Sequence, residues 1–143
     1  MSQESVEIAR QGVEQFNQQF NSTEELDLGF LAPDFTLDNS NAAFDAAVYR
    51  GHDGAREFMS LLRGMWKLQQ IDPQEFIPVG EDRVIVPIRL VSVGRGDIET
   101  VANAAMVVTI RERKIAHMKA FQNKADALEA AGLAEQDARA DSS

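Results

Sequence analysis

Residues 83–93, with the sequence RVIVPIRLVSV, predict a β-strand that is apolar on both of its faces. Successive side chains of a strand point to opposite sides of the sheet. One side carries Val84, Val86, Ile88 and Leu90, and the other carries Ile85, Pro87, Val91 and Val93 with Arg89 among them. A strand in a small domain usually has one face in water, so both faces of this sheet need a cover.

Helical periodicity dominates the first half of the chain. Apolar residues three and four apart predict a helix over 5–21, and the segment STEEL predicts a short second helix that ends at Pro33. A short strand is expected over 34–40. A third helix begins near Gly51 and carries Trp66 on its apolar face.

The second half has the period of strands. Residues 74–80, 83–93, 98–110 and 114–122 predict four strands, and a final short helix follows from Asn123. The predicted fold is therefore α+β, with three N-terminal helices packed on one face of a curved antiparallel sheet and a short C-terminal helix. We expect a single domain over 1–133 and a disordered polar tail over 134–143.

The apolar faces of the three predicted helices can cover only one face of this sheet. The neighbouring strand, 98–110, is also apolar on both sides. A patch of that size left in water would favour aggregation. The sequence therefore predicts a homodimer in which two sheets pack face to face.

Composition excludes several classes of function. The chain has 143 residues, 14 Lys and Arg against 23 Asp and Glu, and a formal charge of −9, which disfavours nucleic acid as a partner. It has no apolar run near the ~20 residues that span a membrane, so a cytoplasmic protein is expected. With no cysteine and only His52 and His117, neither a metal site nor a cofactor is expected.

Two segments carry a resemblance to a known family. YRGHDGAREFM, which opens the third helix, and KIAHMKAFQNKADALEAAGL, which ends the domain, resemble the SnoaL-like branch of the NTF2-like superfamily. The likeness covers residues 3–133 and is strongest to actinobacterial members with a YxGxxGxxxF signature. It implies a cone-shaped fold with an apolar pocket between the helices and the concave sheet. Family members include isomerases, cyclases, dehydratases and binding proteins, so the fold does not settle the function.

The resemblance also supplies a test for catalysis. Where ketosteroid isomerases carry a phenol, a catalytic base and a second oxyanion acid, this chain has Gly12, Asn39 and Ala105. An amide cannot act as a base at neutral pH. Asp38 would be the base only if the match to the family were shifted by one residue. Asn39, and not Asp38, shares a face with Phe35 and Leu37 in the predicted strand, which argues against this shift. Whether the protein is an enzyme is left open.

The family register predicts which residues line the pocket. They are Arg89, Asn103, Asn39, Phe16, Trp66, Val91 and Met118. The same register predicts a dimer interface on the convex face that includes Val84, Val86, Ile88, Ala104, Met106 and His117. In this interpretation Arg89 binds an anionic or carbonyl group of the ligand, or instead pairs with Asp38 or reaches solvent.

These residues predict a protein that binds a small hydrophobic molecule in an apolar pocket. Isomerase, cyclase or lyase activity on a carbonyl compound is left open, with Asp38 as the candidate catalytic residue. The alternatives are a binding protein without chemistry and a dimeric interaction module.

Overall fold

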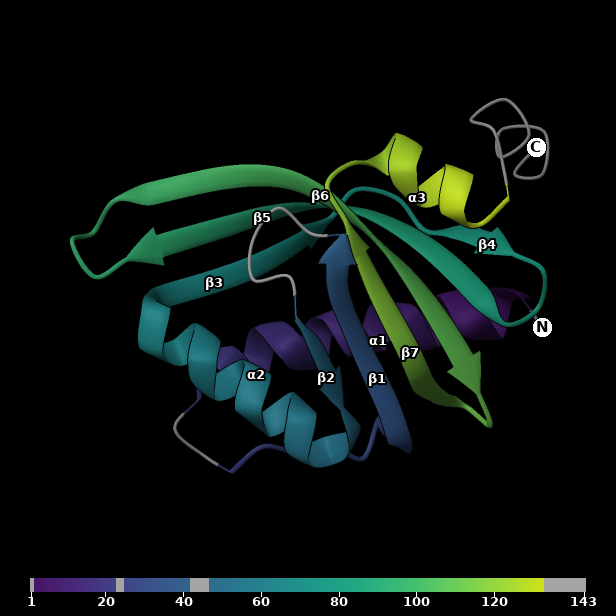
Figure 1. Ribbon diagram of the computed structural model, residues 1–143, viewed down its shortest axis with the longest axis horizontal. Helices are drawn as coiled ribbons and strands as arrows, with labels where there is room; N and C mark the ends of the chain where they lie inside the picture. Colours follow the sequence, from purple (N-terminus) through teal and green to yellow (C-terminus); the bar gives the residue numbers. More distant parts are fainter. Residues whose placement is uncertain (1, 23–24, 42–46, 133–143) are drawn as a thin grey trace.

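A computed structural model describes residues 2–22, 25–41 and 47–132 of the chain. The described residues form three helices and a seven-stranded sheet (Figure 1). In chain order the elements are α1 (Ser2–Phe20), β1 (Leu31–Asn41), β2 (Val48–Arg50), α2 (Gly51–Met65), β3 (Trp66–Pro73), β4 (Ile77–Val79), β5 (Arg83–Gly94), β6 (Glu99–Arg111), β7 (Lys114–Phe121) and α3 (Lys124–Ala130). The predicted tail, 134–143, lies outside the described residues.

The sheet is mixed, which corrects the prediction of a purely antiparallel one. The strand order is β2-β1-β7-β6-β5-β3, with β4 paired to β5. The β3, β5, β6 and β7 pairings are antiparallel, but β1 pairs with β7 in parallel. Parallel pairing requires a long crossover. Here the chain from β1 passes through α2 and five further strands before it returns in β7.

Helices α1 and α2 lie on one side of the sheet, which we call the inner face. The largest apolar cluster joins Ala9 and Val13 of α1 to inner-face residues of the central strands. Val84 and Val86 of β5 and Val108 of β6 are among its least exposed members. Ala55 and Phe58 of α2 pack against the same cluster. The long helix α1 therefore runs across the strands and covers them (Figure 1).

The opposite side of the sheet, which we call the outer face, is covered in part by α3. Ile85 of β5 and Val107 of β6 form a second apolar cluster with Ala127 and Leu128 of α3. Asn123 caps α3 as predicted, because its side chain accepts a hydrogen bond from the Asp126 backbone N–H at 2.8 Å. Within one chain, α3 therefore covers part of the second apolar face of β5.

Two predicted elements differ from the structure. The described residues 25–30 contain no helix, and Pro33 lies inside β1 instead of ending a helix. Pro33 lies where the β1–β7 register shifts between Leu31 and Thr36. Proline has no backbone N–H to donate, and such an irregular position in a strand tolerates this. In addition, α2 ends at Met65, so Trp66 begins β3 instead of extending the helix.

The YxGxxGxxxF segment has a clear packing role at the start of α2. Gly51 has a φ of 68°, a conformation that glycine adopts without strain. A Cβ on Gly54 would lie 2.9 Å from the Tyr49 backbone carbonyl carbon, so α2 packs on β2 only without a side chain there. The Tyr49 and Phe58 rings lie 5.1 Å apart between centroids. The motif is thus explained by backbone geometry and packing.

Among the described helices, none has the length and apolar character needed to cross a membrane.

Candidate functional site

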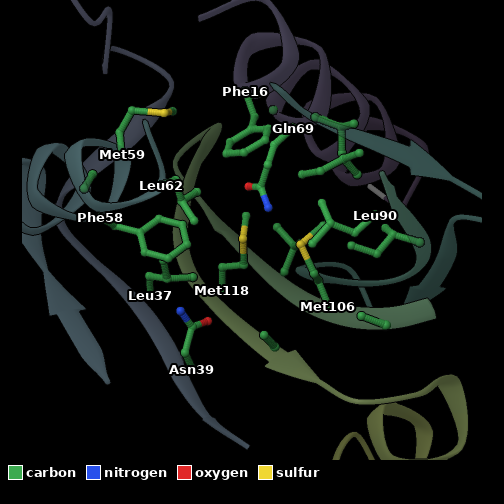
Figure 2. Close-up of a pocket in the computed structure, with 18 of the residues that line it drawn as sticks. Phe16, Leu37, Asn39, Phe58, Met59, Leu62, Gln69, Leu90, Met106 and Met118 are labelled. Atoms are coloured by element: carbon green, nitrogen blue, oxygen red, sulfur yellow. The ribbon is translucent and has the colours of Figure 1, made fainter. Parts of the chain in front are cut away.

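An inner cavity of about 660 Å³ lies between the inner face of the sheet and helices α1 and α2. Its wall is mainly aliphatic, aromatic and thioether side chains, several of which Figure 2 shows converging on one space. Phe16 comes from α1, Phe58 and Leu62 from α2, and Met106 and Met118 from β6 and β7. A concave, apolar site of this size is typical of small-molecule binding sites.

The polar residues of the wall are all uncharged. Every described lining residue is apolar or carries an amide or a hydroxyl, apart from Trp66 with its indole N–H. The amide and hydroxyl residues are Gln15, Gln19, Asn39, Gln69, Ser92, Thr100, Asn103 and Gln122. The described wall therefore offers hydrogen bonds, but neither a charge nor a group that titrates near neutral pH.

Asn39 is the most distinctive polar group of the cavity. It lies on β1, on the same side as Phe35 and Leu37, and is only 6% exposed. Its backbone N–H donates to the Ala47 carbonyl oxygen at 2.9 Å. Its side-chain amide forms no hydrogen bond with any described residue and points into the cavity, from which its atoms remain accessible (Figure 2). Buried polar groups in proteins nearly always have a partner, so this amide is available for one.

A second polar pair lies on strands β3 and β5. Gln69 Nε2 donates to Ser92 Oγ at 2.9 Å, and the two residues are direct partners in the β3–β5 register. Each is 4% exposed. The hydrogen bond holds the Gln69 carboxamide in one orientation, and Figure 2 shows it directed into the cavity from the side opposite Asn39.

Two polar contacts hold the helices over the cavity. Asn17 of α1 donates to the Ile71 carbonyl oxygen at 2.9 Å and accepts from the Ile71 N–H at 2.8 Å, which fixes α1 to β3. Arg63 of α2 donates to the backbone carbonyl oxygens of Gln19 and Ser22 at the end of α1. A cation at a helix C-terminus also interacts favourably with the helix dipole.

Several predicted pocket residues do line the cavity. Asn39, Phe16, Trp66 and Met118 are all part of its wall. Asn103 also borders it, but Asn103 is exposed and is the cross-strand partner of Arg89. Direct partners in an antiparallel pair share a face, so the Asn103 side chain belongs to the outer face.

The predicted placement of Arg89 and Val91 in the pocket is wrong. Arg89 is exposed, and neither residue is part of the cavity wall. Ile88, Leu90 and Ser92 of the same strand line it instead. In the predicted register the two faces of β5 and β6 are exchanged, because a shift of one residue moves every side chain of a strand to the other side.

The same exchange contradicts the predicted dimer residues. Val84, Val86, Ile88 and Met106 are buried against α1 within one chain, and Ala104 packs on the same cluster. They cannot form an interface without unfolding the inner core. Of the predicted set only His117 lies on the outer face, where it is the register partner of Thr36 and Thr109.

Asp38, the candidate catalytic residue, lies outside the cavity. It is the register partner of Lys119 on the outer face, and its carboxylate lies 3.8 Å from Lys119 Nζ. Hydrogen bonds from the Ser40 hydroxyl and backbone N–H lower the Asp38 pKa, with a smaller contribution from Lys119. A carboxylate held ionised in this way is a poor proton acceptor.

Of the positions that the resemblance matches to catalytic groups, Gly12 and Asn39 belong to the cavity wall. Ala105 borders the cavity, but its side chain packs in the outer-face cluster with Val107 and Leu128. At Gly12 a Cβ would lie 2.5 Å from Ile115 Cδ1, so Ile115 fills the space that a side chain would need. Within the described residues, no group of His, Cys, Asp or Glu could hold a metal ion.

Sequence reasoning missed Gln69 and Ser92. Both depend on the segment WKLQQIDP, which the sequence analysis did not predict as a strand and which forms β3. Once 66–73 is known to be a strand next to β5, the alternation of Gln69 with its neighbours indicates a buried amide. Ser92 lies on the face of β5 that carries Ile88 and Leu90, which the prediction placed outside.

Solved structures show to which fold this architecture corresponds. The chain is similar to an NTF2-like protein from Anabaena variabilis, with 23% identity, a TM-score of 0.70 and coverage of 86% of this chain and 92% of the other. It is also similar to TerC co-crystallised with polyporic acid (19% identity, TM-score 0.70, coverage of 90% and 98%). A candidate polyketide cyclase from Xanthomonas campestris matches with 18% identity, a TM-score of 0.69 and coverage of 85% and 92%.

At the level of sequence, neither the protein-family models nor the curated proteins give a significant match. The likeness to the solved structures therefore concerns the fold. The strand order, the helices over the inner face and these neighbours agree: this chain has the NTF2-like fold.

Proposed function

We propose that this protein binds a small, mostly apolar molecule in the inner cavity. The observation that carries the proposal is the amide of Asn39, a residue 6% exposed overall, which points into an apolar cavity of about 660 Å³ and bonds no described residue. Apolar surface supplies the affinity for such a ligand, and a few polar groups orient it. The TerC structure, which was co-crystallised with polyporic acid, shows that a protein of this fold has been studied with a small molecule.

We favour binding without chemistry over isomerase, cyclase or lyase activity. Those reactions on a carbonyl compound need a group that accepts or donates a proton. The described cavity wall consists of apolar, amide and hydroxyl residues, and Asp38 faces the other way. Cyclase activity is the second candidate function, because the similar Xanthomonas structure is described as a polyketide cyclase.

The proposal is tested with Nile red, an uncharged dye whose fluorescence rises in apolar surroundings. The protein should bind it saturably, and Ala104→Phe, which adds a ring inside the cavity, should reduce the affinity at least about tenfold by occupying the space. Val48→Phe adds the same ring at an exposed position outside the wall and should bind like wild type. Equal binding by both variants would contradict the proposal.

We also propose that the chain forms a homodimer through the part of the outer face that α3 leaves open. Val101 is 54% exposed there, opposite Val91 and next to the Arg89–Asn103 pair. An exposed apolar strip with a polar border is the usual composition of a protein interface.

A further inference from the structure

We infer that the inner cavity selects an uncharged, elongated ligand with a hydrogen-bonding group at each end. The inference rests on the proposed function and names the class of ligand. It follows from two buried carboxamides, Asn39 and Gln69, that enter the cavity from opposite sides (Figure 2).

Asn39 supplies the first end of the site. The main-chain bond to Ala47 holds its backbone, whereas its side-chain amide forms no hydrogen bond with any described residue. The amide oxygen and nitrogen stay accessible from the cavity, so they can bond water or a ligand there. A ligand group that both donates and accepts, such as a hydroxyl or an amide, can take the place of that water.

Gln69 supplies the second end. One N–H of its carboxamide is used by Ser92 Oγ at 2.9 Å. Its carbonyl oxygen forms no hydrogen bond with any described residue, and a second N–H remains. The Gln69–Ser92 pair is therefore an oriented anchor with unused hydrogen-bonding capacity.

The middle of the site is apolar. Met118 lies between the two carboxamides in Figure 2, and Leu37, Phe58, Leu62, Leu90 and Met106 surround it. A ligand that reaches both amides must cross this region, so its central part is hydrocarbon or aromatic.

The uncharged wall of the cavity disfavours a ligand with ionised ends. The described wall contains no cationic or anionic residue. The nearby cations do not belong to the described wall. Arg63 Nη2 donates to the carbonyl oxygens of Gln19 and Ser22, while its buried Nε has no partner among the described residues. Lys119 lies beside Asp38 on the outer face. An unpaired carboxylate or ammonium in such a site keeps a large desolvation cost. The formal charge of −9 disfavours anions further.

The experiment compares three ten-carbon compounds as competitors of bound Nile red: terminal decanediol, decanol and decanedioate. The diol should compete about threefold to tenfold better than decanol, which is the effect of one added neutral hydrogen bond. Decanedioate, which has the same chain with two carboxylates, should compete least. In Asn39→Leu and in Gln69→Met, the diol should lose its advantage while decanol retains most of its affinity.

Thr36→Val on the outer face of β1 is the matched control and should behave like wild type, and circular dichroism verifies that each variant is folded. Equal competition by diol and decanol, competition by decanedioate as strong as that of the diol, or an unchanged diol advantage in both cavity variants would overturn the inference while leaving apolar binding intact. Absence of Nile red binding by folded wild-type protein would instead remove the proposed function and this inference with it.

Discussion

Asp38 Oδ2 lies 3.8 Å from Lys119 Nζ on the outer face of β1 and β7, whereas the residues just before them, Leu37 and Met118, point into the cavity. Adjacent residues of each strand thus form a surface ion pair and part of the cavity wall. Asp38, the candidate catalytic base, therefore lies outside the cavity.

Replacement of Asp38 tests this assignment. Hydrogen bonds from Ser40 lower the pKa of Asp38 below its ordinary value of 3.8. The unfolded chain therefore binds this proton at a higher pH than the folded one, so the ionised carboxylate stabilises the fold above about pH 4 and the contribution is lost as pH falls through the folded pKa. Asp38→Asn should lower the free energy of unfolding at pH 7 by at most about 1 kcal/mol, because solvent screens the site.

Chemical denaturation of the Asp38→Asn variant at neutral and acidic pH measures this difference, which should shrink in acid. Ser40→Ala should act in the same direction with a smaller effect, since the backbone N–H remains. Nile red binding should be unchanged. A loss of binding in Asp38→Asn would show that Asp38 acts in the cavity.

Two glycines of α2 should respond to alanine in opposite ways. At Gly54 the new Cβ would lie 2.9 Å from the Tyr49 backbone, so Gly54→Ala should destabilise the protein by about 1–3 kcal/mol through overpacking. At Gly64 no atom lies within 4 Å of the new Cβ, so Gly64→Ala should stabilise it by up to about 1 kcal/mol through helix propensity. Thermal unfolding of both variants gives the two signs, and a stable Gly54→Ala would contradict the close packing of α2 on β2.

The assignment of faces is tested by Met106 and Arg89. Met106 is 6% exposed in the inner core, so Met106→Ala should lower the free energy of unfolding by about 2–5 kcal/mol. Arg89 is exposed on the outer face, so Arg89→Ala should change it by no more than about 0.5 kcal/mol and leave Nile red affinity unaltered. Urea denaturation measures the free energy of unfolding of both variants. If Met106→Ala left it unchanged, Met106 would lie on the outer face, as the sequence predicted.

The proposed homodimer is tested at Val101. Val101→Glu places a charge on the open part of the outer face and should give monomers in size-exclusion chromatography with light scattering, because burying two symmetry-related carboxylates is costly. Ile98→Glu is the control, because Ile98 is 70% exposed in the β5–β6 turn, and this variant should retain the dimer. A monomeric wild-type protein would rule out the proposal.

Local chemistry predicted much of the fold. The apolar spacing over 5–21 matches α1, the Asn123 cap matches α3, and the predicted strands 83–93, 98–110 and 114–122 match β5, β6 and β7. These features depend on residues close together in the chain, so a sequence pattern can show them. The resemblance carried by YxGxxGxxxF agrees with the NTF2-like fold and with the packing of Tyr49, Gly54 and Phe58.

What the sequence by itself determined was the class of fold, the apolar pocket and part of its wall, including Phe16, Asn39 and Met118. Only the tertiary structure decided that β3 replaces the end of a helix, that β1 joins the sheet in parallel, and which face of β5 is inside. The physical reason is that β5 is apolar on both sides, so its own alternation leaves the inward face undetermined. Contacts with α1 and α3, far away in the chain, make that choice, and with it they place Gln69 in the cavity and Arg89 in water.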